Sequence, residues 1–173
     1  MRFTIRPFTE ADADRVASWR YPSPYDVYDV SQDQPMDDEM RDPARWGASW
    51  FAVDDAENGE LAGFLELAAS ESGSAVGTQV EVEVGLGLRP DLTGRGVGVG
   101  FVHAALDFSR ERWAPTSFAL DVFPWNERAI RCYERARFDR GEVYDRRFDN
   151  GNEVTFLRMR RSADLRGSPP SGA

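Results

Sequence analysis

The stretch that decides the fold reads Val82-Glu-Val-Gly-Leu-Gly-Leu-Arg-Pro90, then Asp91-Leu-Thr-Gly-Arg-Gly-Val-Gly-Val-Gly100 and Phe101-Val-His-Ala-Ala-Leu-Asp-Phe108. Its first part alternates valine with glutamate, which is typical of a strand with one buried face. Its last part has apolar residues at positions 101, 102, 105 and 108, which is helical spacing. The sequence therefore predicts a core strand, a glycine-rich turn and a helix, in that order.

The glycines of this turn need a physical reason, because a glycine in a helix costs about 0.5–1 kcal/mol relative to alanine. Tight packing of the helix on the sheet is one reason, and close approach of a ligand is another. The unpaired N–H groups and the positive dipole end of a helix N-terminus form a site for phosphate. Because four glycines alternate from Gly94 to Gly100 directly after a core strand, we favour an anion site.

The kind of anion follows from the motifs that are missing. A dinucleotide-binding GxGxxG would need glycine at position 99 or 101, where the chain has Val99 and Phe101. The phosphate-binding loop of nucleotide hydrolases requires a lysine, and all 21 basic residues of this chain are arginine. A pyrophosphate on another carrier remains.

Composition excludes several other classes of protein. The 173 residues, 41% of them hydrophobic, fit a single domain with a full core. The net charge of -9 argues against general affinity for nucleic acid, and no apolar stretch is long enough to span a membrane. One cysteine and one histidine exclude a disulfide framework and an ordinary zinc centre, and no metal is expected. We expect a cytoplasmic protein.

The rest of the chain predicts a mixed α/β (α+β) domain at residues 1–161, followed by a disordered tail at 162–173. Thr9 and Asp12 form a capping-box-like pair before a first helix. Residues 21–45 form a long connection with one short helix near 37–41. The remaining strands are expected at 3–6, 49–53, 61–67, 80–88 and 118–123, with two last strands joined at Asn150-Gly151 and ending near Met159. A turn at Asn58-Gly59 joins the second and third strands, the polar run 70–78 separates the third from the fourth, and a helix is expected at 126–136.

The strand, turn and helix at 82–108 resemble the acetyl-CoA motif of the GNAT superfamily of N-acetyltransferases. A later motif of that family appears as Asn126-Glu-Arg-Ala129-Ile-Arg-Cys-Tyr133-Glu-Arg-Ala-Arg-Phe138. The resemblance covers roughly residues 1–160, and it implies a mixed, mostly antiparallel sheet of about seven strands, splayed in the middle and flanked by about four helices. It also implies acetyl-CoA as co-substrate and a primary amine as acceptor.

The resemblance also implies which residues form the site. Tyr133 would protonate the leaving thiolate, and Glu83 would deprotonate the amine directly or through water, with Glu81 in reserve. Residues expected to hold the coenzyme are Gly85, Leu86, Gly87, Leu88, Thr93, Gly94, Arg95, Gly96, Val97, Gly98 and Asn126. The best candidates for an acceptor wall, chosen as aromatic residues near carboxylates, are Trp19, Tyr21, Tyr25 and Tyr28.

Two positions depart from the family pattern [QR]-x-x-G-x-[GA] and its later helix. In the ungapped register, which we prefer, Thr93 stands where Gln or Arg is usual, whereas a shift of two residues makes the stretch from Arg95 to Gly100 a literal match. Arg137 stands where the family has a helix-ending glycine, so a different cap or backbone strain is expected there.

Simpler interpretations stay open for several residues. Glu83 can be a solvent-facing strand residue, and Tyr133 can be a core tyrosine beside Ala129 and Ile130. The string His103-x-x-x-Asp107 matches a motif of an unrelated acyltransferase class, but here it lies inside a helix and is interpreted as coincidence. Cys132 is expected to be inert. The acidic residues of the long connection suit a cationic amine but are usually solvated surface: Asp26, Asp29, Asp33, Asp37, Asp38 and Glu39.

Three hypotheses of function remain: an acetyl-CoA-dependent N-acetyltransferase acting in a ternary complex, a CoA-binding sensor or partner-binding module without turnover, and an acyltransferase for a longer acyl group. By analogy with the superfamily, a homodimer is expected.

Overall fold

The computed structural model describes residues 1–32, 34–74, 77–148 and 151–164. The turn residue Asn150, Asp33 and the predicted tail beyond Asp164 lie outside these ranges. The strands are β1 (Phe3–Pro7), β2 (Trp50–Asp55), β3 (Leu61–Ser74), β4 (Gly77–Leu88), β5 (Ser117–Val122), β6 (Asp139–Arg147) and β7 (Glu153–Ser162). The α-helices of the described residues are α1 (Glu10–Ala17), α2 (Gln34–Met40), α3 (Gly98–Trp113) and α4 (Glu127–Arg135). Short 3₁₀ helices follow at η1 (Tyr25–Tyr28), η2 (Val30–Gln32), η3 (Pro43–Arg45) and η4 (Pro90–Leu92).

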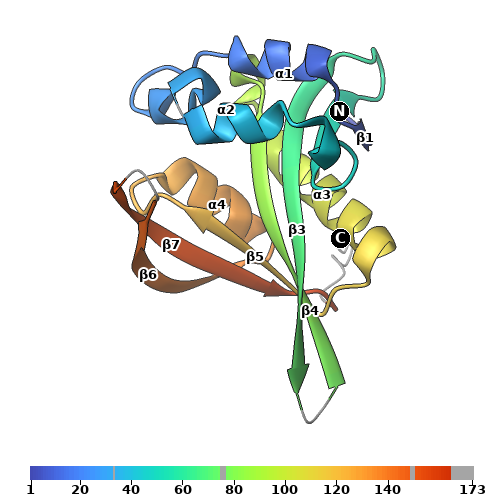
Figure 1. Cartoon of the computed structure of the whole chain (residues 1–173), viewed down its shortest axis with the longest axis vertical. Coiled ribbons are helices and arrows are strands. Elements are labelled where there is room, and N and C mark those ends of the chain that lie inside the picture. The colour runs from blue at the N-terminus through green and yellow to red at the C-terminus, as the bar shows by residue number, and fades with distance from the viewer. Residues whose placement is uncertain (33, 75–76, 149–150, 165–173) are drawn as a thin grey trace, which may run out of the picture. The chain divides into compact units, whose positions relative to one another are not determined.

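The strands form one seven-stranded sheet in the order β1-β2-β3-β4-β5-β7-β6 (Figure 1). The antiparallel pairs are β1 with β2, β2 with β3, β5 with β7 and β7 with β6. β4 and β5 pair parallel. The predicted mixed, mostly antiparallel seven-stranded sheet with four helices is confirmed. The chain forms two compact units, one from Met1–Ala68 with Val84–Phe108 and one from Ala69–Glu83 with the chain from Ser109 onward.

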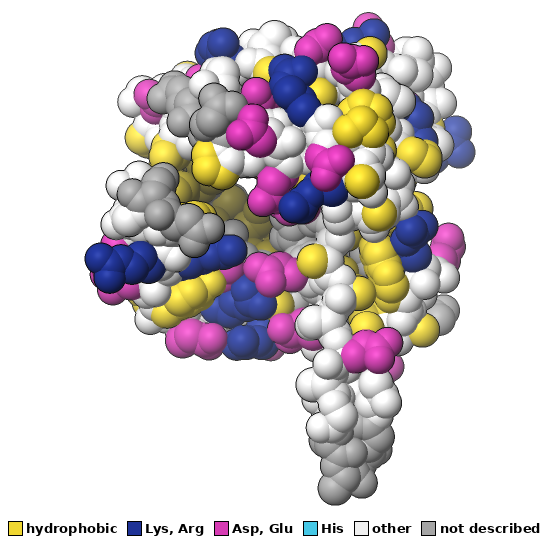
Figure 2. Space-filling model, in the orientation of Figure 1, with side chains coloured by type: hydrophobic (Ala, Val, Ile, Leu, Met, Phe, Trp, Pro, Cys, Tyr) yellow, Lys and Arg dark blue, Asp and Glu magenta, His cyan; other side chains and the backbone are white. Residues whose placement is uncertain are grey.

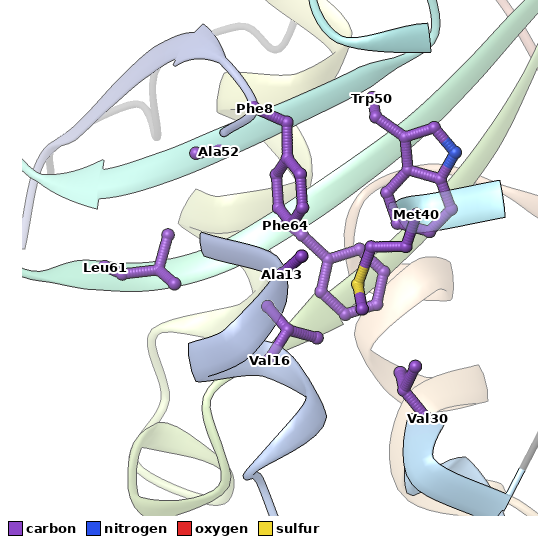
Figure 3. Close-up of a cluster of buried hydrophobic side chains, with 9 residues drawn as sticks. All are labelled: Phe8, Ala13, Val16, Val30, Met40, Trp50, Ala52, Leu61 and Phe64. Carbon is purple, nitrogen blue, oxygen red and sulfur yellow. The ribbon is translucent and has the colours of Figure 1, made fainter. Parts of the chain in front are cut away.

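The first unit buries apolar side chains on both faces of β2 and β3. On one face, residues of α1 and α2 pack with Trp50 and Phe64, whose rings stack with centroids 5.5 Å apart (Figure 3). On the other face, the Phe51 ring packs edge-on against the Phe108 ring of α3, with ring centroids 4.9 Å apart. Because neighbouring strand residues point to opposite faces, Trp50 and Phe51 serve the two sides of the sheet.

The N-terminal capping box is present as predicted. The Thr9 hydroxyl and backbone N–H both donate to the Asp12 carboxylate, and the Asp12 N–H donates back to the Thr9 hydroxyl. Asp12 also binds the Arg6 guanidinium at 2.6 Å, and Arg6 reaches Asp54 of β2 at 2.7 Å. Thus α1 is fixed to both β1 and β2.

The polar run 70–78 differs from the prediction. We expected it to separate two strands, but β3 continues to Ser74 and β4 begins at Gly77. The two strands are hydrogen-bonded neighbours, and small polar residues such as Ser70 and Gly73 suit a ribbon without a buried face. Periodicity gave no signal here because both faces are solvated.

In the second unit, one face of the sheet is mostly apolar, with the buried Arg161 of β7 donating to the Ala136 carbonyl. Its buried residues include Val82 of β4, Phe118 and Leu120 of β5, and Leu157 and Met159 of β7. Ile130 of α4 is also fully buried.

No helix of the described ranges combines the length and apolar character needed to cross a membrane.

Candidate active site

The end of β4 packs closely against β3 at two glycines. A Cβ at Gly87 would lie 2.2 Å from the Phe64 ring, and one at Gly85 would lie 3.2 Å from Glu66 Cβ. On the neighbouring strand β3, a Cβ at Gly63 would lie 2.5 Å from the Phe101 ring. These glycines therefore have a structural role, whether or not a coenzyme also runs along this strand.

The glycine-rich turn after β4 is open instead. Gly94 and Gly96 have positive φ values of 76° and 79°, and a Cβ at either would meet nothing within 4 Å. Within the described residues, the amide N–H groups of Gly94, Arg95, Gly96 and Val97 have no hydrogen-bond acceptor. The first regular helical bond of α3 runs from the Phe101 N–H to the Val97 carbonyl. The turn thus presents unpaired donors at the start of a helix, as an anion site requires.

The residues flanking this turn are held by their own contacts. The Thr93 hydroxyl donates to the Pro90 carbonyl at 2.7 Å, so it stabilises η4. The Arg89 guanidinium binds the Asp91 carboxylate at 2.7 Å and also reaches the Leu61 carbonyl and Glu60. The hydrogen bond with Asp91 raises the pKa of Arg89, against a smaller opposing effect of burial, and the same hydrogen bond lowers the pKa of Asp91. Arg89, which the sequence did not single out, anchors the base of the turn to β3.

The predicted acceptor-wall residues make structural contacts of their own. The Trp19 ring packs 6.1 Å from the Phe64 ring. The Tyr21 hydroxyl donates to the Leu88 carbonyl at 2.8 Å, and the Tyr21 N–H donates to Asp29. The structure therefore brings Tyr21 and the predicted coenzyme strand together. Tyr25 and Tyr28 lie on η1, where Tyr28 is 36% exposed.

The acidic residues of the long connection are less uniform than expected. Asp29 is buried, 3% exposed, and accepts the Tyr21 N–H. Asp37 pairs with Arg41 and Glu39 with Arg45, so much of the surface charge is compensated. Asp33 lies outside the described residues.

Helix α4 carries the residues of the second predicted motif. Asn126 caps the helix, since its side-chain oxygen accepts the Ala129 N–H at 3.1 Å. Tyr133 is half-buried in the last turn and contacts the Phe138 ring edge-on at 6.2 Å. Burial raises the pKa of Cys132, which keeps the thiol protonated at neutral pH.

The end of α4 has the predicted departure from normal backbone geometry. Arg137 has a φ of 67°, in the left-handed region that favours glycine. The Arg137 N–H donates to the Glu134 carbonyl and the Phe138 N–H to the Tyr133 carbonyl, which is the Schellman pattern. The chain thus keeps the cap geometry that glycine usually supplies and places an arginine in it.

The two candidate bases lie on the exposed face of β4 in the second unit. Glu83 accepts a hydrogen bond from Arg158 at 3.2 Å, and its side chain is 47% exposed. Glu81 lies 3.5 Å from Arg158 and accepts from Ser117. Asp121 joins them, accepting from Arg158 at 3.0 Å and from Tyr144 at 2.7 Å. The sequence gave no signal for Arg158, Asp121 and Tyr144, because their meeting depends on which strands are neighbours.

Comparison with known proteins identifies the class of protein. The chain matches the model of the acetyltransferase (GNAT) family over residues 13–138, and it therefore belongs to this family. The chain is an N-acetyltransferase in the general sense of the family, whose co-substrate is acetyl-CoA. No curated protein sequence matches it significantly.

Solved structures show the same fold. A GNAT-family acetyltransferase from Bacillus anthracis superposes with a TM-score of 0.70 at 16% identity, over 95% of this chain and 96% of that chain. The spermidine/spermine N-acetyltransferase SpeG from Vibrio cholerae superposes with a TM-score of 0.61 at 20% identity, over 94% of this chain and 93% of that chain.

Proposed function

We propose that this enzyme transfers the acetyl group of acetyl-CoA directly to a primary amine in a ternary complex. The observation that carries the proposal is the row of unpaired amide N–H groups from Gly94 to Val97, directly before α3. Such a row binds a diphosphate, because several donors and the helix dipole act on one anion. Arg95 is exposed beside these amides and adds positive charge.

Glu83 takes the proton of the amine in this proposal. The acceptor enters as an ammonium ion, and its N–H bond breaks as an O–H bond forms on the Glu83 carboxylate, directly or through a water molecule. The freed nitrogen lone pair then attacks the thioester carbon. The half-exposed position of Glu83 supports this role, since the carboxylate is open to solvent and to a small amine.

Tyr133 gives its phenolic proton to the departing thiolate. The C–S bond breaks as the new C–N bond is completed, and the acylated nitrogen then gives its second N–H proton through water to the Tyr133 phenolate. The products are the acetylated amine and coenzyme A, and Glu83 returns its proton to solvent. The support for this role is the position of Tyr133 in the family's helix motif and its half-buried place on α4, with a hydroxyl at the end of a ring that Phe138 supports.

The acceptor is a primary amine that carries positive charge. The net charge of -9 favours a cationic acceptor. A polyamine is one such acceptor, and the similar fold of a spermidine/spermine N-acetyltransferase makes it the first compound to try.

The test is the affinity for coenzyme A, measured by isothermal titration calorimetry. Gly96→Asp places bulk and negative charge among the proposed donors, so we expect Kd to rise at least about tenfold. Gly59→Asp is the matched control, because Gly59 also has a positive φ of 72° and open space around its Cβ position. Both substitutions carry the same backbone strain, but only the first should weaken binding. Equal Kd values for the two variants would refute the assignment of the turn.

Turnover is tested separately with isotope-labelled acetyl-CoA and a set of amines. Label in an amine product supports the transferase. Tight binding of coenzyme A without loss of thioester in any mixture would instead support the CoA-binding sensor.

A further inference from the structure

The second unit has a charged face opposite its apolar face. Side chains alternate between the two faces along each strand, so the sequence neighbours of buried Val82, Leu120 and Leu157 point to the face opposite the apolar one. This exposed face carries four carboxylates and two guanidinium groups, from Glu81 and Glu83 on β4, Asp121 on β5, Glu142 on β6, and Arg158 and Arg160 on β7. Figure 2 shows basic and acidic side chains interleaved over β5, β7 and β6.

Arg158 lies at the centre of this charged face. It is directly opposite Asp121 in the β5–β7 pairing, and its Nη1 donates to Asp121 at 3.0 Å and to Glu83 at 3.2 Å. Its Nη2 lies 3.5 Å from Glu81. One guanidinium group therefore compensates three carboxylates on two neighbouring strands.

Burial fixes this arrangement. The Arg158 and Asp121 side chains are only 13% and 12% exposed, whereas Glu83 is 47% exposed. Burial acts to lower the pKa of Arg158, but the hydrogen bonds and charges of Glu83 and Asp121 outweigh it and raise that pKa. The guanidinium is thus permanently charged and held by Asp121, and it presents a fixed donor to the more exposed Glu83.

We propose that Arg158 is a positioning residue for the proton-accepting carboxylate of Glu83. It holds Glu83 Oε1 through Nη1, and Oε2 has no partner within the described residues, so Oε2 is the atom that receives the proton of the amine. The inference rests on the proposed function of Glu83. It adds that the anchored cation determines the direction of this carboxylate.

The contacts of Arg158 predict what happens when it is removed. Glu83 Oε1 would lose its hydrogen-bond donor, and the carboxylates of Glu81 and Asp121 would lose the guanidinium group that they share with it. A carboxylate without this anchor can rotate and is directed at the amine less often, and a small misplacement of a catalytic group costs up to about 100-fold in rate.

The first measurement needs no substrate. The Glu83 carboxyl carbon is observed by NMR at constant neutral pH in ¹³C-glutamate-labelled full-length protein, and its signal is assigned by its loss in Glu83→Gln. We expect Arg158→Gln to move this signal, because the hydrogen bond from Arg158 Nη1 to Glu83 Oε1 is lost. Arg160→Gln is the control, because Arg160 binds Glu142 and Glu81 and makes no contact with Glu83. A Glu83 signal at the same position in Arg158→Gln and in the natural protein would overturn the inference.

The second measurement is kcat and KM for acetyl-CoA with spermidine, tyramine or a lysine peptide as acceptor. Arg158→Gln should lower kcat about tenfold at constant KM, whereas Arg160→Gln should leave kcat near that of the natural enzyme. An unchanged kcat in Arg158→Gln, with kcat lowered in Glu83→Gln, would overturn the inference alone. If Glu83→Gln keeps the kcat of the natural enzyme, then Glu83 is not the base, and the proposed function and this inference fail together.

Arg158→Lys keeps the inference testable if Arg158→Gln does not fold. Lysine keeps the charge but lacks the planar fork that binds two carboxylates at once. We therefore expect kcat to fall about tenfold at constant KM. An unchanged kcat in Arg158→Lys would contradict a positioning role.

Discussion

Replacing Arg137 with glycine should stabilise this protein, although it removes a side chain. Arg137 has a φ of 67° at the end of α4, where a Cβ crowds the backbone. The left-handed conformation costs a non-glycine residue about 1–2 kcal/mol. Glycine has more conformational freedom than arginine in the unfolded chain, which offsets about 0.5–1 kcal/mol of the free energy gained by removing this strain. The free energy of unfolding should therefore rise by about 0.5–1 kcal/mol.

Arg131→Gly is the matched control, because Arg131 lies on the same helix with ordinary helical geometry. Its exposed contact with Glu127, at 3.9 Å, contributes little. Glycine in the middle of a helix costs about 0.7 kcal/mol here, so the two substitutions should act in opposite directions.

Urea unfolding followed by circular dichroism measures both variants, with equal m-values as the condition for comparison. In thermal unfolding of a chain of this length, the midpoint temperature should rise by about 2 °C in Arg137→Gly and fall by about 2 °C in Arg131→Gly. A loss of stability in Arg137→Gly equal to that in Arg131→Gly would refute the strain argument.

Three further predictions concern other parts of the structure. Gly87→Ala should lose about 1–3 kcal/mol by unfolding assays, because its Cβ would lie 2.2 Å from the Phe64 ring, whereas Gly73→Ala, with open space, should change stability by less than about 0.5 kcal/mol. Asp12→Asn should cost about 2 kcal/mol at pH 7. Burial acts to raise the pKa of Asp12, but the hydrogen bonds and charge of Arg6 outweigh it and lower that pKa, so this stabilisation is lost as the pH falls below about 4. The variant should therefore be less acid-sensitive in unfolding titrations. Tyr133→Phe should lower kcat about 100-fold in steady-state assays with Kd for coenzyme A within about twofold, and an unchanged kcat would remove Tyr133 from the mechanism.

The local elements of the fold could be predicted because short-range physics decides them. The pair Thr9 and Asp12 predicted the capping box, and the order of strand, glycines and helix at 82–108 predicted β4, the turn and α3. The arginine at position 137 predicted an unusual helix end, since a left-handed residue is required there. Each of these signals lies within a few residues of the structure that it predicts.

The features that escaped prediction depend on distant residues. Arg158 meets Asp121 and Glu83 only because β7 pairs with β5 and β5 pairs with β4, which no local pattern reveals. Asp29 is buried and accepts the N–H of Tyr21 in the long connection 21–45, whose sequence has no regular period. The far end of the β3–β4 ribbon, at residues 68–73 and 78–79, is exposed on both faces, so it has no hydrophobic period to detect.

Several expectations from the sequence stay predictions. These are the roles of Tyr133, Glu83 and Asn126, the aromatic acceptor wall, the homodimer, the absence of a metal, the cytoplasmic location and the division into a domain at 1–161 and a tail.

The central claim is that backbone amides of one turn hold the diphosphate of the co-substrate. The most direct measurement follows the backbone amide signals of Gly94, Arg95, Gly96 and Val97 by ¹H–¹⁵N NMR while coenzyme A is added. We predict large, saturable shifts of these four signals, with the Gly59 signal of the β2–β3 turn unmoved. Saturable binding of coenzyme A that leaves the four signals in place would contradict the claim.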